Sequence, residues 1–420
     1  MTNSQREAAF QCGRECLGIV FAAFTHQLLI EARQANIERL LFVARDGHLL
    51  LRLAELFSHM PAHSDSPQLS YLQISRRVVA LSSTPTIGPS EIAALMRIRS
   101  EGDPVSRFAN YYALPESALR NIAPNSNDPL HLLRSADGQK LVVHARATQL
   151  GVLTSYLEQE SVFGTERAAL VDVGWKGSIQ RALNQIYHDR PGFSPLHGYY
   201  LGLWSDDPHQ AVAPDELFHG LISDMRHGRG VLEGAAWHAA FIIEALCRAD
   251  HGPVISLAAE SNKGIVPVYG SGTASRVAEM RSESWRAPII DGILDFARTY
   301  VASGRASTPS AEESLKDARH ALVNLSFFPS ANEIEILGRL IHTETHAPNW
   351  STPLIADQST RPLVSPRTWL RGLQSPWRGG YIASTLGIIG SHAFKGFENI
   401  SARFPPHIKE SLRQLLLRIS

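Results

Sequence analysis

Four short apolar runs limit what this chain can fold into more than any other feature of its sequence. They cover residues 40–44, 71–74, 168–171 and 198–203, and the first three lead into polar or glycine-rich turns. Apolar runs of this length between turns are typical of strands that are buried on both faces. Helical patterns separate the runs, and strands that alternate with helices form parallel sheets. The sequence therefore predicts an α/β protein with a parallel sheet of at least four strands flanked by helices.

The remaining patterns are mainly helical. Residues 6–36 have the apolar spacing of one long helix, and residues 82–164 have that of a helical insertion broken by Pro, Asn and Ser. The chain after residue 258 is also predicted to be mainly helical. We therefore predict a domain over residues 1–258 that contains the sheet and a mainly helical accessory region over residues 259–420.

Charge and composition exclude several classes of protein. The 420 residues include 40 Lys and Arg and 40 Asp and Glu, so the formal net charge is zero. This balance argues against nucleic-acid binding, an acidic tail and a disordered chain. Three cysteines, Cys12, Cys16 and Cys247, provide no disulfide framework and indicate a reducing compartment.

The N-terminal sequence has neither a secretory signal nor a predicted membrane span. No basic region precedes an apolar core, and the apolar stretch 17–24 is shorter than the roughly 18 residues that a span requires. We therefore expect a cytoplasmic protein whose contact with a membrane is at most peripheral, at the inner face.

Charged residues follow the first two predicted strands. Arg45, Asp46 and Gly47 follow the first strand, and Arg76 and Arg77 follow the second. Ligands of open parallel sheets bind at the carboxyl ends of the strands, and guanidinium groups bind phosphate with two parallel hydrogen bonds. These residues are therefore candidate anion ligands. The alternatives are an ordinary turn closed by glycine and a solvated pair of arginines.

The turn after the third strand is the most informative, and its sequence is Gly174-Trp175-Lys176-Gly177-Ser178. Glycines allow close approach of the backbone, and the N-terminus of the following helix favours a phosphate. The spacing is not that of a Walker A loop, which argues against an ATPase. Asp172 precedes this turn and is placed to accept hydrogen bonds from sugar hydroxyls. A plain strand-to-helix turn is the alternative, but convergence of all three turns predicts a ligand with two phosphate groups and a sugar.

Two further patterns contain titratable groups that could bind a ligand or a metal. The helical pattern of residues 231–249 contains Glu233 and Glu244, which face the cleft or form structural ion pairs, because buried carboxylates are costly when unpaired. His342 and His346 have a spacing that could ligate zinc, but the sequence offers no third ligand nearby.

Three segments together resemble bacterial polysaccharide-biosynthesis proteins that are often fused to a haloacid-dehalogenase-type phosphatase. The segments are Leu41-Phe42-Val43-Ala44-Arg45-Asp46-Gly47, Tyr71-Leu72-Gln73-Ile74-Ser75-Arg76-Arg77 and Val171-Asp172-Val173-Gly174-Trp175-Lys176-Gly177-Ser178-Ile179-Gln180. In that family the unit is similar to a phosphoribosyltransferase fold that acts as a glycosyltransferase. The resemblance covers about residues 15–258 and leaves the last third of the chain unassigned. It implies that residues 1–258 are a catalytic domain, and residues 259–420 are then a candidate for binding an acceptor or a partner.

The resemblance implies transfer of a 5-phosphoribosyl group from phosphoribosyl pyrophosphate to a hydroxyl of a bacterial surface glycan, such as a capsule or O-antigen precursor carried on a lipid. Pyrophosphate would leave, and direct displacement would give a β-ribofuranoside. The sequence has no D-x-D-x-T phosphatase motif, so a separate haloacid-dehalogenase-type phosphatase is expected to remove the phosphate from the product.

The resemblance also implies residue roles. Arg45, Asp46, Gly47, Arg76 and Arg77 would bind the pyrophosphate. The ribose and its 5-phosphate would be bound by Asp172, Gly174, Trp175, Lys176, Gly177, Ser178 and Gln180. Ordinary phosphoribosyltransferases carry two adjacent acidic residues before the phosphate loop, whereas here Val173 follows Asp172. Ribose binding is therefore expected to be weaker or differently arranged.

An acceptor hydroxyl needs a general base, and Asp46 is the first candidate, followed by Glu233 and His251. Mg²⁺ carried with the donor pyrophosphate is the possible cofactor, since charge develops on the leaving group. Two other functions stay open. One is a glycosyltransferase that uses a nucleotide sugar, and the other is a catalytically silent scaffold that binds phosphoribosyl pyrophosphate.

Overall fold

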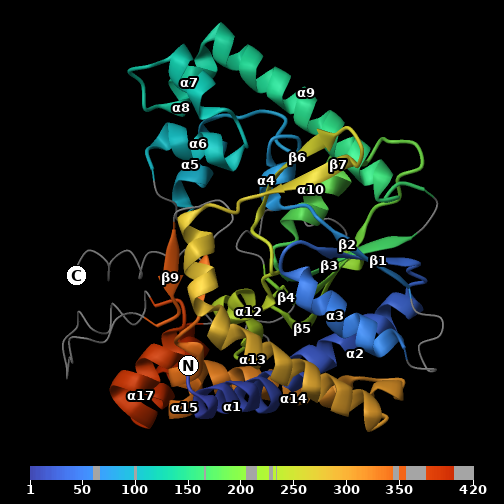
Figure 1. Cartoon of the computed structure of the whole chain (residues 1–420), viewed down its shortest axis with the longest axis vertical. Helices are drawn as coiled ribbons and strands as arrows, with labels where there is room; N and C mark the ends of the chain where they lie inside the picture. The colour runs from blue at the N-terminus through green and yellow to red at the C-terminus, as the bar shows by residue number, and fades with distance from the viewer. Residues whose placement is uncertain are drawn as a thin grey trace.

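The computed structural model describes residues 1–59, 67–98, 102–164, 167–204, 215–226, 230–232, 234–343, 350–355 and 375–401. Its centre is a five-stranded sheet, parallel throughout, with the strand order β2-β1-β3-β4-β5 (Figure 1). The strands are β1 (Arg39–Val43), β2 (Gln68–Leu72), β3 (Ala168–Trp175), β4 (His197–Leu203) and β5 (Phe218–Asp224). The predicted α/β class, with a parallel sheet flanked by helices, is confirmed.

Alternate residues of the strands bury their side chains on opposite faces of the sheet. In β1, Leu40 and Phe42 belong to one buried apolar cluster, and Leu41 and Val43 belong to another. Each face therefore needs a layer of helices, which explains why the strands are almost uninterrupted apolar runs.

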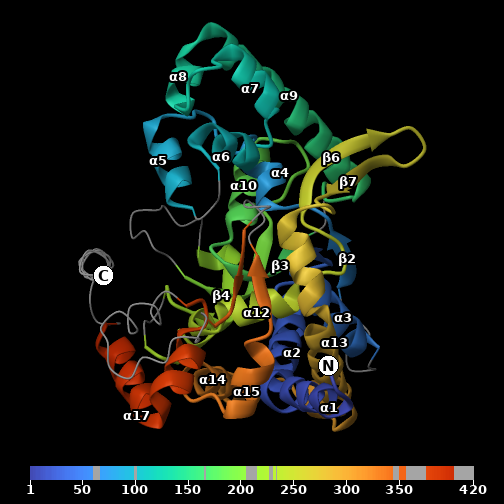
Figure 2. The same cartoon turned by 60° about the vertical axis from the view of Figure 1, so that its left-hand side comes forward.

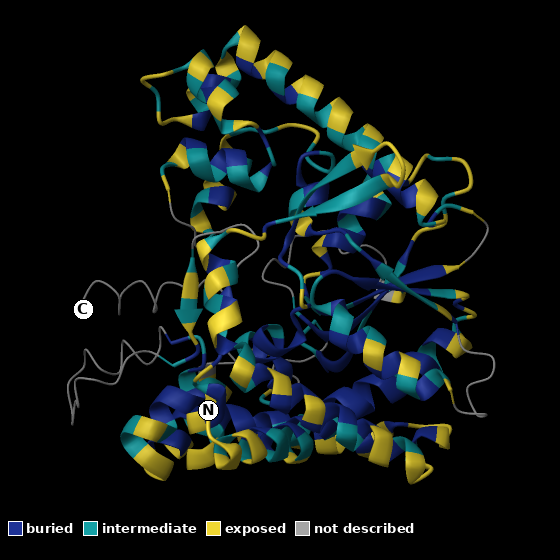
Figure 3. Ribbon diagram, in the orientation of Figure 1, coloured by how far each residue is buried: buried dark blue, intermediate teal, exposed yellow. Residues whose placement is uncertain are grey.

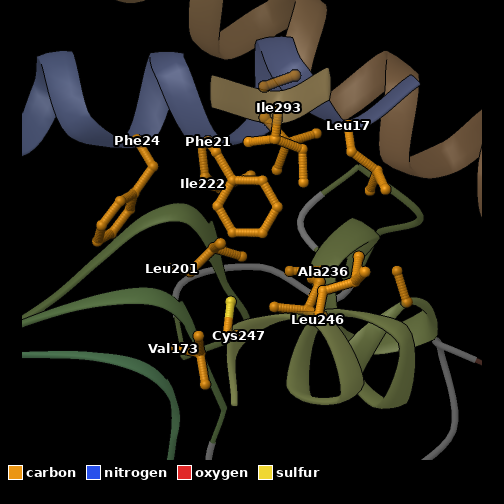
Figure 4. Packing of buried hydrophobic residues seen from close by; sticks show 14 of the residues in the cluster. Leu17, Phe21, Phe24, Val173, Leu201, Ile222, Ala236, Leu246, Cys247 and Ile293 are labelled. Carbon is orange, nitrogen blue, oxygen red and sulfur yellow. The ribbon is translucent and has the colours of Figure 1, made fainter. Parts of the chain in front are cut away.

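One face is covered by helices from both ends of the chain. They are α1 (Asn3–Cys12), a π-helical turn (Gly13–Leu17), α2 (Gly18–Gln34), α3 (Gly47–Ser58), α11 (Ala235–His238), α12 (Ala240–Cys247), α13 (Ala274–Ala302) and α14 (Glu312–Phe327). Figure 4 shows Phe21 of α2 and Ile293 of α13 on the helical side of this core, facing Leu201 of β4. This layer therefore binds the C-terminal half of the chain to the sheet.

The N-terminal helical segment, Asn3–Gln34, is long and apolar enough to cross a membrane by length and composition. However, 67% of its most apolar window is buried inside the structure. It packs against α13, and its α2 part also packs against α14. Packing in the core thus accounts for its apolar composition.

The opposite face of the sheet carries α4 (Arg76–Ala80), α10 (Ser178–Tyr187) and part of α9 (Ala136–Gln159). An antiparallel hairpin of β6 (Val254–Glu260) and β7 (Gly264–Tyr269) lies against α9 (Figure 2). The predicted insertion over residues 82–164 is helical in the described part, with α5 (Pro89–Arg97), α6 (Pro104–Tyr111), α7 (Glu116–Ile122) and α8 (Pro129–Arg134). These helices and α9 enclose a separate buried apolar cluster, and Figure 3 shows exposed residues along the outer side of α9.

The C-terminal region is mainly helical, as predicted, and also contains strands that the sequence did not indicate. After α14 come α15 (Ala331–Leu337), the hairpin of β8 (Ile341–Thr343) and β9 (Ser351–Pro353), and α17 (Arg378–Ser401). The division at residue 258 stays a prediction. Strand β6 crosses it, and one buried cluster contains residues from both sides of it.

The five strands agree with the predicted minimum of four, although β5 was not located in the sequence. Two local expectations need correction. Strand β3 continues through Trp175, so that only Lys176 and Gly177 connect it to α10. The helical pattern of residues 231–249 is two short helices, α11 and α12, which meet at Ala239.

Candidate functional site

A cavity of about 840 Å³ opens at the carboxyl ends of β1 and β3. These neighbouring strands continue the chain in opposite directions across the sheet, from β1 to β2 and from β3 to β4. The cavity therefore lies at the topological switch point, where open parallel sheets bind their ligands. Its wall includes nine of the residues to which the resemblance assigns a binding role: Arg45, Asp46, Arg76, Asp172, Gly174, Trp175, Lys176, Gly177 and Ser178.

The turn from β3 to α10 requires both of its glycines. Gly174 has φ 138°, and a Cβ atom there would lie 2.2 Å from the carbonyl oxygen of Gly202 in β4. Gly177 has φ 59° and is the N-cap of α10, and a Cβ atom there would lie 2.6 Å from the ring of Phe218. Only glycine adopts both conformations without strain in this space. The peptide bonds Ala44–Arg45 and Gly174–Trp175, at the ends of β1 and β3, are both cis.

The N-terminus of α10 faces this cavity. Ser178 is the first residue of the helix and is exposed, as is Lys176, and both line the cavity. The N-cap residue, Gly177, has no side chain that could accept the amide hydrogens of the first turn. Free amide donors, the helix dipole and a lysine ammonium form a suitable cradle for a phosphate group.

Two carboxylates line the floor between the strands. Burial raises the pKa of Asp46, although the positive charges of Arg45 and Arg76 oppose this shift. Burial and the nearby charge of Asp46 raise the pKa of Asp172 well above its usual value, although a hydrogen bond of 2.8 Å from the Val173 amide opposes the shift. Both groups thus resist ionisation more than a solvated aspartate does, which is typical of groups poised for proton transfer or cation binding.

Arg45 is held by residues from the C-terminal region. Its guanidinium forms an ion pair with Glu279 of α13 and donates a hydrogen bond of 3.0 Å to the hydroxyl of Thr343 in β8. The Thr343 hydroxyl also donates to Glu279, and Arg276 Nη1 donates to the other carboxylate oxygen at 3.1 Å. The side chains of Arg45 and Glu279 are 10% and 1% exposed. Arg45 therefore borders the cavity as one partner of a buried ion pair.

A second buried arginine completes this network. Arg248 follows α12, lines the cavity and donates through Nη2 to the backbone carbonyl of Glu279 at 2.9 Å and to Ser282 Oγ at 2.9 Å. Burial lowers the pKa of Arg248 to about 10, because it disfavours the charged form. The region 259–420 thus supports the wall of the cavity.

Two of the predicted pyrophosphate ligands do not line the cavity. Gly47 is buried at the start of α3, where a Cβ atom would lie 2.9 Å from the backbone carbonyl carbon of Phe42. Its role is to let the helix begin directly against β1. Arg77 is half-buried outside the cavity, and burial lowers its pKa. Successive residues of a helix point about 100° apart, so Arg76 faces the cavity and Arg77 does not.

Two other predicted site residues, Gln180 and His251, lie elsewhere. Gln180 is fully buried and donates to the carbonyls of Leu196 and Leu217, both at 2.8 Å, so it ties α10 to the neighbouring chain. His251 is not among the cavity-lining residues; its Nδ1 donates to its neighbour's carbonyl at 2.7 Å, and its Nε2 accepts from the Tyr71 hydroxyl at 2.8 Å. Burial lowers the pKa of His251, so the ring is neutral at pH 7. Glu233 lies outside the described residues.

Glu244 does face the cavity and also has fixed partners. Its Oε1 accepts a hydrogen bond of 2.8 Å from the indole nitrogen of Trp175, and its Oε2 lies 3.4 Å from Nδ1 of His342. The sequence left cleft and ion pair open for this residue; Glu244 lines the cavity, and its contact with His342 is an ion pair when that ring is protonated. The side chain of His342 is 3% exposed. His346, the second histidine of the candidate zinc pair, lies outside the described residues.

Aromatic side chains that the sequence did not single out form another part of the wall. They include Trp204, Trp237, Phe241 and Trp350. Trp204 directly follows β4, Trp237 and Phe241 lie on α11 and α12, and Trp350 directly precedes β9, so only the tertiary fold brings them together. A single weak signal was present, since Trp204 directly follows the fourth apolar run and Trp237 lies in an apolar helical pattern.

The acidic residues of the cavity suit a magnesium ion that arrives with phosphate groups. In the described part of the chain, no cluster of three or more His, Cys, Asp or Glu side chains could hold a metal ion by itself. Mg²⁺ is typically bound through one or two carboxylates together with substrate phosphates. Asp46 and Asp172 interact electrostatically and face the same cavity, so they match that pattern.

No protein-family model matches the chain, and no curated protein is significantly similar to it.

Proposed function

We propose that this protein is a glycosyltransferase that transfers 5-phosphoribosyl from phosphoribosyl pyrophosphate to a hydroxyl of a bacterial surface glycan. One observation carries the proposal. The ends of β1 and β3 and the start of α4 bring a lysine, an arginine, two carboxylates and a helix N-terminus into one cavity. A donor with phosphate groups at both ends of a ribose needs two separate anion sites with hydrogen-bond acceptors between them.

The residues divide into two anion sites. Lys176, Ser178 and the first amides of α10 bind the 5-phosphate, since a helix N-terminus and an ammonium group both attract a dianion. Arg76, exposed at the start of α4, binds the pyrophosphate. Arg45 contributes positive potential rather than a full bidentate contact, because Glu279 and Thr343 already occupy two of its nitrogens. Asp172 accepts hydrogen bonds from the ribose hydroxyls.

The reaction exchanges one bond at C1 of the ribose for another. The acceptor oxygen forms a bond to C1 as the bond from C1 to the pyrophosphate oxygen breaks, and the electron pair of that bond leaves with pyrophosphate. Arg76 stabilises the negative charge that develops there. The proton of the acceptor hydroxyl passes to Asp46, whose raised pKa brings it closer to the pH at which a base is most effective. Attack from the face opposite the leaving group gives the β-ribofuranoside.

Asp172, together with the phosphates of the donor, would hold Mg²⁺, which would neutralise charge on the pyrophosphate and leave Asp46 as the base. The product keeps its 5-phosphate, so a separate phosphatase of the haloacid dehalogenase type would act next. The acceptor is proposed to be a lipid-linked glycan, which would place the protein in the cytoplasm, in peripheral contact with the inner face of the membrane.

The first alternative is a glycosyltransferase that uses a nucleotide sugar. The observation in its favour is the exposed indole of Trp237, because an aromatic ring can stack on a nucleobase. The second alternative, a silent binder of phosphoribosyl pyrophosphate, needs the anion sites but no base. Product formation in wild type and its loss in Asp46→Asn, with donor binding retained, would exclude the silent binder.

Calorimetry tests the identity of the donor. It measures the affinity of the protein for phosphoribosyl pyrophosphate, for nucleoside diphosphates and for nucleotide sugars, each with and without Mg²⁺. We expect selective binding of phosphoribosyl pyrophosphate that is lost in Lys176→Ala. Arg167→Ala is a matched control, because Arg167 is an exposed cation beside the opposite end of β3. Preference for a nucleotide would contradict the proposed donor.

A further inference from the structure

Three indole rings form a continuous row along one side of the cavity. The rings of Trp175 and Trp204 are stacked, with centroids 4.8 Å apart and an angle of 15° between their planes. The ring of Trp237 meets that of Trp204 edge to face, with centroids 3.9 Å apart and an angle of 82°. All three line the cavity, and Trp237, at the end of the row, is 39% exposed.

The row is fixed from below by the sheet. Gly202 of β4 has no side chain, and a Cβ atom there would lie 2.7 Å from the ring of Trp175 and 3.2 Å from Cβ of Ala236. Ala236 is fully buried and directly precedes Trp237 on α11. The strand and α11 therefore approach closely, which fixes the backbone that presents Trp237.

An exposed tryptophan in a cavity loses the stabilisation that complete burial would provide. Isolated apolar side chains on a convex surface need no explanation, but a large ring held at the wall of a concave site is typical of ligand binding. An indole offers a flat apolar face at low entropic cost, since its side chain has two rotatable bonds.

Hydrogen-bonding groups adjoin the row. The indole nitrogen of Trp175 holds the Glu244 carboxylate at 2.8 Å, and the other oxygen of that carboxylate is 3.4 Å from the His342 ring. Glu244 is 22% exposed at its side chain. A carboxylate oxygen and an apolar ring thus face the same space, a combination that suits a neutral ligand with a C–H face and a rim of hydroxyl groups.

We propose that Trp237, supported by Trp204, is the platform for the sugar ring of the acceptor, and that Glu244 accepts a hydrogen bond from one of its hydroxyl groups. This assignment rests on the proposed glycosyltransferase function. The carboxylate is the reason for choosing a sugar over a nucleotide. It repels the phosphates of a nucleotide but accepts hydrogen bonds from a neutral glycan.

Tryptophan fluorescence of the full chain tests the platform. The probes are methyl pyranosides and disaccharides of glucose, galactose, mannose, rhamnose and N-acetylglucosamine. We expect at least one of them to change the emission of wild type and to leave that of Trp237→Phe unchanged. Trp285→Phe is the matched control, because Trp285 lies on α13, outside the cavity and beside Arg339, and should keep the response.

Calorimetry of the responding saccharide then measures the contribution of the ring. Trp237→Ala should weaken binding about tenfold, which corresponds to about 1.4 kcal/mol. Trp237→Phe, which keeps an aromatic face, should stay within about threefold of wild type. Binding of phosphoribosyl pyrophosphate should be unchanged in both variants, because the anion sites are formed by other residues.

Each outcome separates the platform from the donor site. If phosphoribosyl pyrophosphate binds and no saccharide changes the fluorescence, the platform is wrong and the proposed donor stands. If nucleoside diphosphates or nucleotide sugars, added as further probes, change the fluorescence and no saccharide does, the sugar assignment is wrong. Saccharide binding that is equal in wild type and Trp237→Ala also overturns it. Failure of wild type to bind phosphoribosyl pyrophosphate contradicts the proposed function, whatever the saccharides do.

Discussion

Removal of the Glu279 charge should destabilise this protein far more than removal of a comparable charge on the same helix. Glu279 forms ion pairs with Arg45 and Arg276 and accepts a hydrogen bond from the hydroxyl of Thr343. The substitution Glu279→Gln keeps the size and shape of the side chain and removes only its charge. Arg45, at 10% exposure, is then left as a buried cation without a full counter-charge.

Loss of one partner from a buried ion pair costs about 3–5 kcal/mol, because the remaining charge stays desolvated. That is a large part of the roughly 5–15 kcal/mol that stabilises a folded domain. Asp295 provides the matched control. It lies on the same helix, α13, and pairs with Arg14 at 3.2 Å, and the two side chains are 38% and 43% exposed. Solvent screens that pair, so Asp295→Asn should cost at most about 1 kcal/mol.

Urea unfolding followed by circular dichroism measures both variants. The midpoint for Glu279→Gln should fall well below that for Asp295→Asn at pH 7. Burial by itself raises the pKa of Glu279, but the charge of Arg45 and the hydrogen bonds from Thr343 and Arg45 outweigh it and hold this pKa below its ordinary 4.5. Because the folded pKa is depressed, the advantage of wild type is present above pH 4.5 and is lost as the pH falls through the folded pKa. Equal midpoints for the two variants at pH 7 would refute the reasoning.

Two further perturbations probe the floor of the cavity. Gly174→Ala should lower the free energy of unfolding in urea by about 2 kcal/mol or more, since it adds a clash with Gly202 to an unfavourable φ. The control Gly192→Ala, also at positive φ but in open space, should lower it less. Equal losses of free energy in the two variants would show that the clash is absent. Asp172→Asn should raise the melting temperature at pH 7, because the raised pKa of Asp172 means that its charged form opposes folding. The gain in melting temperature should vanish below pH 3.8, the ordinary pKa of an aspartate. A melting temperature below that of wild type at pH 7 would contradict the raised pKa.

The central strands of this fold are readable in the sequence because each is a compact apolar run with a turn at its end. Strand β5 is not, since its segment Phe218–Asp224 contains a histidine, a glycine and a serine among its apolar residues. The hairpin of β6 and β7 was missed for a related reason. Its strands are only partly buried and include Pro267, so neither gives a clear apolar run.

The site was predictable only as far as local order along the chain determines it. Residues directly after β1 and β3, such as Asp46 and Lys176, line the cavity because the carboxyl ends of adjacent parallel strands must lie together. The counter-charge of Arg45 comes from Glu279, which is 234 residues away in the sequence, and no local pattern indicates such a pair. The choice between Arg76 and Arg77 likewise depended on how α4 is rotated against the sheet.

Binding of phosphoribosyl pyrophosphate to the wild-type protein and to Lys176→Ala tests the account most directly. Lys176 is exposed at the N-terminus of α10, so its substitution should leave the fold intact. The account predicts that wild type binds this donor in preference to nucleoside diphosphates and nucleotide sugars, and that Lys176→Ala, with unchanged circular dichroism, does not bind it. Equal affinity of the two proteins for the donor, or a wild type that prefers a nucleotide, would contradict it.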